Sequence, residues 1–439
     1  MLRHAGHEAW CVGGAVRDAL LGHEHLDWDI ATSALPQEVV QVFRRTVPVG
    51  IAHGTVGVLD GRGVMHEVTT FRKDVRTDGR HAVVEFGVSL DEDLARRDFT
   101  INAIAYDPAT GELRDPFDGQ TDIRRGIVRA VGNPADRMRE DRLRALRAIR
   151  FAARFTFHIE PATWAAVREC APFLDRLSAE RVRQEIEKTM QQVELPSVAM
   201  EWWRESGALA ALVPAIAGAP EERFRALDFL PRARSVAAAG RDGAPAASAA
   251  RDSKGPALAR IAMLFFGDEP ASVEKAVRAL KFSNSDAAWI VALARARQEA
   301  GVAAERSFDS GEWDRGAGRA AIRRWVAAVG RTRVDAFCAL LSAERLARDA
   351  RPDGVTGGWG TPSGLRDRLA AFRRAATDVA FNDPVELADL ALDGKDLAHA
   401  GISEGPAMGR VLRRLLDRVI EDPARNTPQE LLRIAREPE

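Results

Sequence analysis

The spacing of apolar residues changes near residue 134, and this change limits most strongly what the chain can fold into. Before it, short apolar and β-branched runs alternate with turn residues, which predicts strands at residues 9–12, 27–31, 55–59, 64–70 and 82–86. A helix is expected at 35–45, because Pro36 suits a first helical turn. After residue 134, Ala, Leu, Arg and Glu recur with a 3.6-residue period. The sequence therefore predicts an α+β N-terminal region followed by helices alone.

Length and composition suggest a globular protein of several domains. The 439 residues correspond to about three domains at roughly 150 residues each, and 46% hydrophobic residues can fill a sizeable core. The net charge of −1 neither favours nor excludes nucleic acid as a partner, so charge is considered locally. Residues 232–256, rich in Ala, Gly and Ser, and residues 352–364, rich in Gly and Pro, are predicted to be connecting segments.

The cysteines and the hydropathy bear on the compartment. Cys11, Cys170 and Cys338 are too far apart for metal-ligand spacing and are typical of small buried residues in a reducing compartment. No apolar run reaches the roughly 18 residues of a membrane span, and the N-terminus has no apolar stretch like that of a signal peptide. We therefore expect a cytoplasmic location and no membrane partner.

Two acidic residues on a predicted strand follow a pair of glycines. Asp27 and Asp29 are two positions apart, so on a strand both carboxylates point to one face and can hold Mg²⁺. Upstream, Gly13-Gly14 has no Cβ atoms, so its N–H groups can approach a phosphate closely. Either feature alone is usually a plain turn. Their combination indicates nucleotidyl transfer, which needs a metal and a phosphate-binding turn.

A third carboxylate lies on the predicted strand 64–70. Glu67 shares a face with Met65 and Thr69, and a charge on such a strand needs a partner. It either completes the metal site or is an edge-strand carboxylate that faces solvent. The strand alone supports both interpretations equally, and the presence of Asp27 and Asp29 favours the metal site.

Residues 96–103 combine phosphate-binding and hydroxyl-binding side chains. The planar guanidinium of Arg97 suits a phosphate. Asp98 and Asn102 are four residues apart, so a helical turn brings them to one face, where they can receive ribose hydroxyls or orient Arg97. From spacing alone, a salt-bridge cluster at a helix start is the commoner explanation.

Residues 137–154 carry a net charge of +5 over 18 residues. On a helix, Asp141, Arg144 and Arg147 follow one side, and a leucine-rich stripe faces the core. An Asp and an Arg can hydrogen-bond the Watson–Crick edge of a base while further arginines contact phosphates. The alternative is a solvated face of i,i+3 ion pairs. Residues 178–185 form a helix start, expected to support this helix through Glu180, Arg181 or Glu185.

Six ordered stretches carry a resemblance to a known family. They are Gly13–Asp18, Asp27–Asp29, Glu67–Arg72, Arg96–Ala103, Asp115–Gly119 and Glu140–Ala148. Together they resemble the class II tRNA nucleotidyltransferase (CCA-adding enzyme) and bacterial poly(A) polymerase family, within the polymerase-β-like superfamily. The resemblance is close over about residues 10–190. Residues 393–397 and Gly405, Pro406, Gly409 and Asn426 resemble the tail of the CCA-adding members.

The resemblance implies an architecture and a set of site residues. It implies an α+β nucleotidyltransferase head at 1–130, a helical neck with a nucleotide-selecting helix at 131–190, a helical body at 191–300 and a helical, tRNA-binding tail at 301–439. It implies that Asp27 and Asp29 hold Mg²⁺, with Glu67 as a third catalytic acid. The implied nucleotide-binding residues are Gly13, Gly14, Arg17, Arg97, Asp98, Asn102, Asp141, Arg144, Arg147 and Arg150. Of these, Asp141 and Arg144 select CTP or ATP.

The implied activity is addition of CMP and AMP from CTP and ATP to the 3′ end of tRNA, with release of pyrophosphate. Alternatives are a poly(A) polymerase, or an enzyme restricted to the CC or the A step; the loop between Glu67 and Arg96 bears on that choice. A further alternative is a non-catalytic RNA-binding protein on a retired polymerase head, which the intact acidic residues disfavour. Residues 261–268 match a His-Asp phosphohydrolase segment of some members but lack histidine, so we expect no phosphatase activity. No DNA partner is expected.

Overall fold

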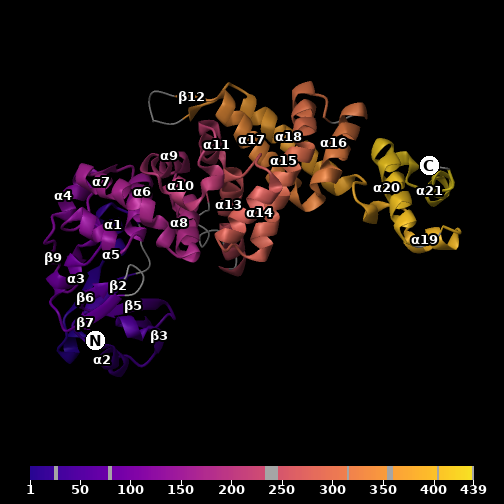
Figure 1. The fold of residues 1–439 in the computed structure, drawn as a ribbon. Coiled ribbons are helices and arrows are strands. Elements are labelled where there is room, and N and C mark those ends of the chain that lie inside the picture. The colour runs from indigo at the N-terminus through magenta and orange to yellow at the C-terminus, as the bar shows by residue number, and fades with distance from the viewer. Residues whose placement is uncertain are drawn as a thin grey trace. The chain divides into compact units, whose positions relative to one another are not determined.

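The computed structural model describes residues 1–23, 28–77, 82–232, 246–313, 316–352, 359–402 and 405–437 (Figure 1). The chain forms two compact units. The first comprises Met1–Thr189 and Val193–Ala217, and the second comprises Met190–Gln192 and Gly218–Glu439. The larger strands all belong to the first unit (Figure 1). The four-part division into head, neck, body and tail remains a prediction.

The first unit is built on a seven-stranded sheet with the order β3-β4-β5-β2-β1-β8-β9. Its strands are β1 (Ala9–Val12), β2 (Asp29–Thr32), β3 (Thr46–Gly50), β4 (Thr55–Leu59), β5 (Met65–Thr70), β8 (Ala105–Tyr106) and β9 (Leu113–Arg114). Neighbouring strands are antiparallel except β2 and β5, which are parallel with Ile30 opposite Val68. A separate hairpin joins β6 (Arg72–Thr77) to β7 (Ala82–Phe86).

Helices complete the first unit. They are α1 (Gly14–Leu20), α2 (Pro36–Val42), α3 (Leu90–Ala95), α4 (Gly119–Arg125), α5 (Pro134–Glu140), α6 (Leu143–Phe155), α7 (Pro161–Cys170), α8 (Ala179–Gln192), α9 (Pro196–Ser206) and α10 (Ala208–Leu212). The last residues of α8 belong to the second unit. Short strands β10 (Ile127–Val128) and β11 (His158–Ile159) pair in parallel.

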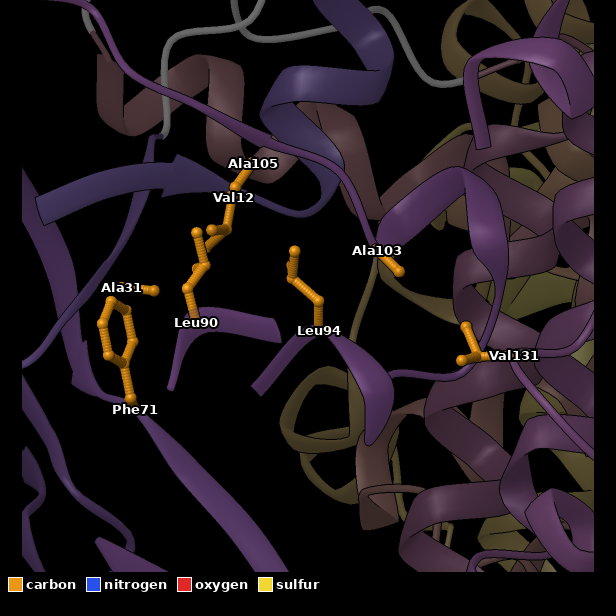
Figure 2. Packing of buried hydrophobic residues seen from close by; sticks show 8 residues of the cluster. All are labelled: Val12, Ala31, Phe71, Leu90, Leu94, Ala103, Ala105 and Val131. Carbon is orange, nitrogen blue, oxygen red and sulfur yellow. The ribbon is translucent and has the colours of Figure 1, made fainter. Parts of the chain in front are cut away.

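A buried apolar cluster fixes α3 against the sheet and the loops around it. The cluster consists of Val12, Ala31, Phe71, Leu90, Leu94, Ala103, Ala105 and Val131 (Figure 2). Leu90 and Leu94 are four residues apart and therefore share one face of α3. A capping box begins this helix: Ser89 accepts from the Glu92 N–H, and the Glu92 carboxylate accepts from the Ser89 N–H at 2.9 Å. These contacts place the residues that follow α3.

The second unit is helical. Its helices include α11 (Glu221–Ala226), α13 (Ala246–Leu264), α14 (Pro270–Ala279), α15 (Asn284–Ser310), α16 (Gly316–Val329), α17 (Val334–Asp349), α18 (Leu365–Asn382), α19 (Gly394–His399), α20 (Pro406–Glu421) and α21 (Pro428–Ala435). Two-residue strands β12 (Arg351–Pro352) and β13 (Trp359–Gly360) pair within it. Buried residues of α19, α20 and α21 form a cluster with Leu390 and Leu392. No helix of the described ranges combines the length and hydropathy that crossing a membrane requires.

The structure confirms the predicted α+β fold followed by helices and corrects several boundaries. The strands expected at 9–12, 55–59 and 82–86 have the predicted bounds, whereas β2 begins at Asp29 and α2 ends at Val42. The connecting segment predicted at 232–256 is wrong over its second part, because α13 begins at Ala246; alanine favours helix enough to explain this. Residues 233–245 lie outside the described residues.

The helix predicted across residues 137–154 is interrupted. Helix α5 ends at Glu140, Asp141 has an extended backbone with φ −147° and ψ 104°, and α6 begins at Leu143. Asp141 therefore lies between two helices instead of on the same helix as Arg144 and Arg147.

Candidate active site

A cavity of about 490 Å³ opens in the first unit, where the sheet meets α6. Strands β1, β2, β4 and β5, the residues after α3, and the junction of α5 with α6 contribute its walls. The lining residues are Val12, Gly13, Gly14, Arg17, Asp29, Ile30, Thr55, Glu67, Thr69, Arg72, Arg96, Arg97, Asp98, Asn102, Asp141, Leu143, Arg144, Arg147, Phe151 and Arg181. Seven of these are arginines and four are carboxylates, so the cavity is suited to an anionic ligand.

The turn between β1 and α1 forms one edge of the cavity. Gly13 has φ +75°, a conformation that residues with a Cβ rarely adopt. A Cβ at this position would lie 3.1 Å from Arg97 Nη1 and 3.8 Å from Asp29 Oδ2. The glycine therefore allows a guanidinium and a carboxylate to converge on the turn.

Two carboxylates come from neighbouring strands. Val12 pairs with Asp29, and the parallel register of Ile30 with Val68 puts Asp29 and Glu67 at adjacent positions of β2 and β5. Both side chains are exposed and line the cavity. Asp27, the other predicted metal ligand, lies outside the described residues. Within the ranges the structure describes, no three His, Cys, Asp or Glu side chains gather to hold a metal. Asp29 and Glu67 nevertheless supply the oxygen ligands that a hard divalent cation prefers.

A chain of hydrogen-bonded side chains crosses the cavity wall from α1 to α6. Arg17 Nη1 donates to Asn102 Oδ1, and Asn102 Nδ2 donates to Asp98 Oδ1 at 2.9 Å. The other oxygen of Asp98 accepts from Arg147 Nε at 2.8 Å. Arg17 also donates to Asp18 at 2.8 Å and lies over the rings of Phe151 and Phe155. Asp98 and Asn102 are therefore in contact, but not through the helical turn that was expected from their spacing, because Phe99 is extended and pairs with Ala130, and a 3-10 turn begins only at Thr100.

The surroundings of Asp98 and Arg17 shift the pKa values of both side chains. Burial would raise the pKa of Asp98, but Arg147 and the hydrogen bond from Asn102 outweigh it and hold that pKa at about 2. Burial lowers the pKa of the Arg17 guanidinium in spite of the neighbouring Asp18. Asp98 is therefore ionised at neutral pH and can accept a further hydrogen bond from a ligand hydroxyl.

The junction of α5 and α6 brings the predicted base-selecting residues together. Asp141 Oδ1 accepts from the Leu143 N–H at 3.1 Å, and its Oδ2 accepts from Arg181 Nη2 at 2.7 Å. Arg144 Nη2 donates to the carbonyl of Arg96 at 2.8 Å, and its Nη1 donates to Glu140 at 2.7 Å. Asp141, Arg144 and Arg181 all line the cavity.

Arg150 has a different environment from the other predicted nucleotide-binding residues. Its side chain is buried, and its Nε donates to Glu185 Oε2 at 2.7 Å across α6 and α8. Burial lowers the pKa of this guanidinium although Glu185 opposes the effect. Arg150 is not among the described lining residues, so its placement is that of a structural support. The expectation that Arg181 or Glu185 supports α6 and its junction is confirmed by both ion pairs.

Several lining residues were missed by the sequence reasoning. Arg72, Arg96, Thr55 and Thr69 line the cavity, and Thr55 and Thr69 are hydrogen-bonded to each other at 3.0 Å across β4 and β5. The threonines come together only through strand pairing, so no local signal identifies them. Arg72 and Arg96 share a buried partner, Asp93, which lies three residues before Arg96. That spacing was a usable signal.

Comparisons with known proteins agree with this geometry. Residues 9–129 match the family described as the poly A polymerase head domain, and residues 156–219 match the probable RNA and SrmB-binding site of polymerase A. The CCA-adding enzyme of Streptococcus suis strain 05ZYH33 is 50% identical over 191 residues, which is 43% of this chain and 47% of that protein. The enzyme of Anoxybacillus flavithermus strain DSM 21510 / WK1 is 50% identical over the same length, with 43% and 48% covered. The matched stretch thus spans about half the length of these curated relatives.

Solved structures extend the similarity over the whole chain. The CCA-adding enzyme of Bacillus stearothermophilus in complex with CTP has a TM-score of 0.72 at 29% identity, covering 99% of this chain and 94% of that one. The Thermotoga maritima CCA-adding enzyme complexed with tRNA has a TM-score of 0.60 at 20% identity, covering 98% and 92%, and supports the fold alone. This chain is thus similar in sequence, over residues 9–129 and 156–219, to the poly A polymerase head domain and the probable RNA-binding site of polymerase A, and similar in fold, over nearly its whole length, to solved CCA-adding enzymes.

Proposed function

We propose that this protein adds CMP and AMP, taken from CTP and ATP, to the 3′ end of tRNA and so builds or repairs the CCA terminus. One observation carries the proposal: a single cavity joins the carboxylates of Asp29 and Glu67, the guanidiniums of Arg17 and Arg97, and the Asp141–Arg144 pair. The cavity thus presents groups suited to a metal, a triphosphate and a base. The CCA-adding relatives support the same activity.

The charged residues and the glycine turn of the cavity have proposed roles in this transfer. The 3′-hydroxyl oxygen of tRNA loses its proton to solvent and forms a bond to the α-phosphorus of the nucleotide, and the bond from that phosphorus to the pyrophosphate oxygen breaks. Arg17 and Arg97 neutralise the triphosphate, next to the turn at Gly13 and Gly14. Asp98, with Asn102 and Arg147 fixing its orientation, accepts a hydrogen bond from a ribose hydroxyl.

Metal binding is part of the proposal. Nucleotidyltransferases of this family are generally metal-dependent, and we infer that the ion is Mg²⁺, held by Asp27 and Asp29 with Glu67 as a further acid. Bound there, Mg²⁺ would make the attacking hydroxyl more acidic and balance the charge of the phosphates.

The Asp141–Arg144 pair accounts for the choice of CTP and ATP. Cytosine and adenine each present an exocyclic amino group beside an unprotonated ring nitrogen. A carboxylate can accept from that amino group while a guanidinium donates to the ring nitrogen. Uracil and guanine present a carbonyl beside an N–H group, the reverse order, and would form neither of these hydrogen bonds. Arg144 and Asp141 therefore replace a nucleic-acid template in this proposal.

The test is nucleotide incorporation into tRNA that ends before, within and after the CCA triplet. Wild type should add C, C and A and stop after three nucleotides. Asp29→Ala should abolish pyrophosphate release, whereas Glu112→Ala, an exposed carboxylate outside the cavity lining, should not change it. Equal release of pyrophosphate by Asp29→Ala and by wild type would refute the proposed nucleotidyl transfer. Long tails from ATP alone would indicate a poly(A) polymerase, and addition limited to CC or A would indicate a restricted enzyme.

Further expectations rest on the same proposal. A chain that acts on tRNA would work in the cytoplasm. Residues 301–439 would contribute to tRNA binding, mainly through phosphates and the shape of the RNA.

A further inference from the structure

A buried carboxylate lies behind the arginine-rich wall of the cavity. Asp93 on α3 is 1% exposed and is not among the described lining residues. Its Oδ1 accepts from Arg96 Nε and Nη2 at 2.9 and 2.7 Å, and its Oδ2 accepts from Arg97 Nη2 at 3.1 Å. The main-chain N–H of Arg72 donates to the same carboxylate at 3.4 Å. All three of these donor residues line the cavity.

The position of Asp93 is fixed by the packing of α3. Leu90 and Leu94 extend from this helix into the apolar cluster of Figure 2, so the backbone around Asp93 is held against the core. Arg96 and Arg97 follow at three and four residues, the spacings at which helical neighbours share a face. One carboxylate is thereby placed behind both guanidiniums.

Asp93 neutralises part of the positive charge that Arg96 and Arg97 place on the cavity wall. Burial would raise the pKa of Asp93, but Arg97 and Arg96 outweigh it, so this pKa is below its usual range and the group is ionised at neutral pH. One negative charge faces two positive charges, which leaves one net positive charge for a ligand. Without Asp93, the two guanidiniums would repel each other in a partly buried site.

Arg97 extends from Asp93 to the glycine turn. Its Nη2 is bonded to Asp93, and its Nη1 lies 3.1 Å from the position that a Cβ of Gly13 would occupy. Its Nε is buried and has no hydrogen-bond partner within the described ranges. The bond to Asp93 is therefore what sets the angle of this guanidinium beside Asp29.

We propose that Asp93 is a positioning residue that holds Arg97 in the orientation that binds the triphosphate of the incoming nucleotide. The proposal rests on the proposed function, because it takes the ligand of the cavity to be a nucleoside triphosphate. The effect of Asp93 falls on nucleotide affinity and leaves tRNA affinity unchanged.

The test is Asp93→Asn in the full-length protein. CTP binding is measured by titration calorimetry without tRNA, and KM values for CTP and for tRNA are measured in the incorporation assay. The dissociation constant and the KM for CTP should rise about tenfold or more, as expected for loss of a well-oriented charge-assisted hydrogen bond, and the KM for tRNA should not change. The matched control is Asp122→Asn: Asp122 is 4% exposed and paired with Arg129, and neither lines the cavity. It should leave CTP affinity unchanged.

A double-mutant cycle separates positioning from general damage. In an Arg97→Gln background, Asp93→Asn should cause no further loss of CTP affinity, whereas a purely structural effect would add to that of Arg97→Gln. Asp93→Glu keeps the charge and should retain CTP affinity within about threefold. If Asp93→Asn does not fold, the CTP affinity of Asp93→Glu is the measurement that tests the proposal. A tenfold loss in Asp93→Glu, full additivity in the cycle, or unchanged CTP affinity in Asp93→Asn would overturn the proposal.

The outcomes distinguish this proposal from the proposed function. A wild type that binds CTP but adds no nucleotide to tRNA would refute the transfer reaction, while the calorimetric data would still decide the role of Asp93. A wild type that adds CCA, with unchanged CTP affinity in Asp93→Asn, would refute only the role of Asp93. Failure of wild type to bind CTP would refute both.

Discussion

The buried ion pair between Arg150 and Glu185 permits a quantitative prediction. Its Nε–Oε2 distance is 2.7 Å, and the two side chains are only 4% and 2% exposed. The Arg150 guanidinium also lies 4.4 Å from the centre of the Phe151 ring. The pair joins α6, which carries cavity residues, to α8. Glu185→Gln removes the negative charge and leaves a buried guanidinium without full compensation.

The expected cost follows from this burial. Removing one partner of a buried ion pair destabilises a protein by about 3–5 kcal/mol. The pair of Arg183 and Glu187 on α8 is more accessible to solvent and provides a control, with a 2.9 Å contact and side chains 24% and 30% exposed. An i,i+4 pair of this kind contributes about 0.3–0.5 kcal/mol. Glu185→Gln should therefore lower the free energy of unfolding several times more than Glu187→Gln does.

The free energy of unfolding is measured by urea denaturation, and amide hydrogen exchange localises the loss to peptides of α6 and α8. The double variant Arg150→Met/Glu185→Leu removes both charges and should recover most of the stability. It should also keep CTP and ATP incorporation, because Arg150 faces Glu185 instead of the cavity. Equal costs for the two glutamine variants would refute the reasoning about burial. Loss of incorporation in a stable double variant would instead show that Arg150 contacts the nucleotide.

Three further predictions concern the cavity. Gly13→Ala should reduce incorporation at least about tenfold, whereas Gly111→Ala, at φ +76° but with open space around it, should cost only about 1 kcal/mol of stability, measured by denaturation. Asp98 has a pKa of about 2 in the folded protein against 3.8 for an unperturbed aspartate, so its ionised form stabilises the fold by about 2 kcal/mol above pH 5. This stabilisation is lost as the pH falls through about 2. The free energy of unfolding of Asp98→Asn, measured against pH, should lack this loss. Asp141→Ala and Arg144→Ala should change the ratio of CTP to ATP incorporation more than the KM for tRNA, and an unchanged ratio would contradict base selection by this pair.

The fold was predictable from the sequence wherever periodicity alone determines structure. Strands β1, β4 and β7 and the helical second half follow the apolar pattern directly. Short strands such as β8 and β9, each two residues long, carry too few positions for a pattern. The break at Asp141 was also missed, because the Arg-rich run on both sides has uninterrupted helical propensity. The side chain of Asp141 accepts from the Leu143 N–H and thereby begins a new helix.

The candidate site was predictable in its residue types but not in its assembly. The contact of Asp98 with Asn102 does not come from the predicted helical turn, because Phe99 is extended, whereas the three-residue spacing of Asp93 and Arg96 is a local relation that indicates their ion pair. The proximity of Glu67 to Asp29 depends on the parallel pairing of β2 with β5, which strand order sets and no local pattern reveals. The orientation of Arg150 depends on α8, which packs against α6 from elsewhere in the sequence. Sequence spacing thus identifies local pairs, whereas tertiary packing decides which charges face the cavity.

The polar groups that would recognise a base are already bonded within the protein. Asp141 accepts from Arg181, and Arg144 donates to Glu140 and to the carbonyl of Arg96. A base must therefore displace or share these partners, so a matching base gains little net free energy from each hydrogen bond. A base with the reverse donor and acceptor order would separate Asp141 from Arg181 and leave the carboxylate opposite a carbonyl, which costs far more. Selection in this site then arises mainly from the penalty on the wrong base, and we expect discrimination against UTP and GTP to exceed any difference in affinity between CTP and ATP.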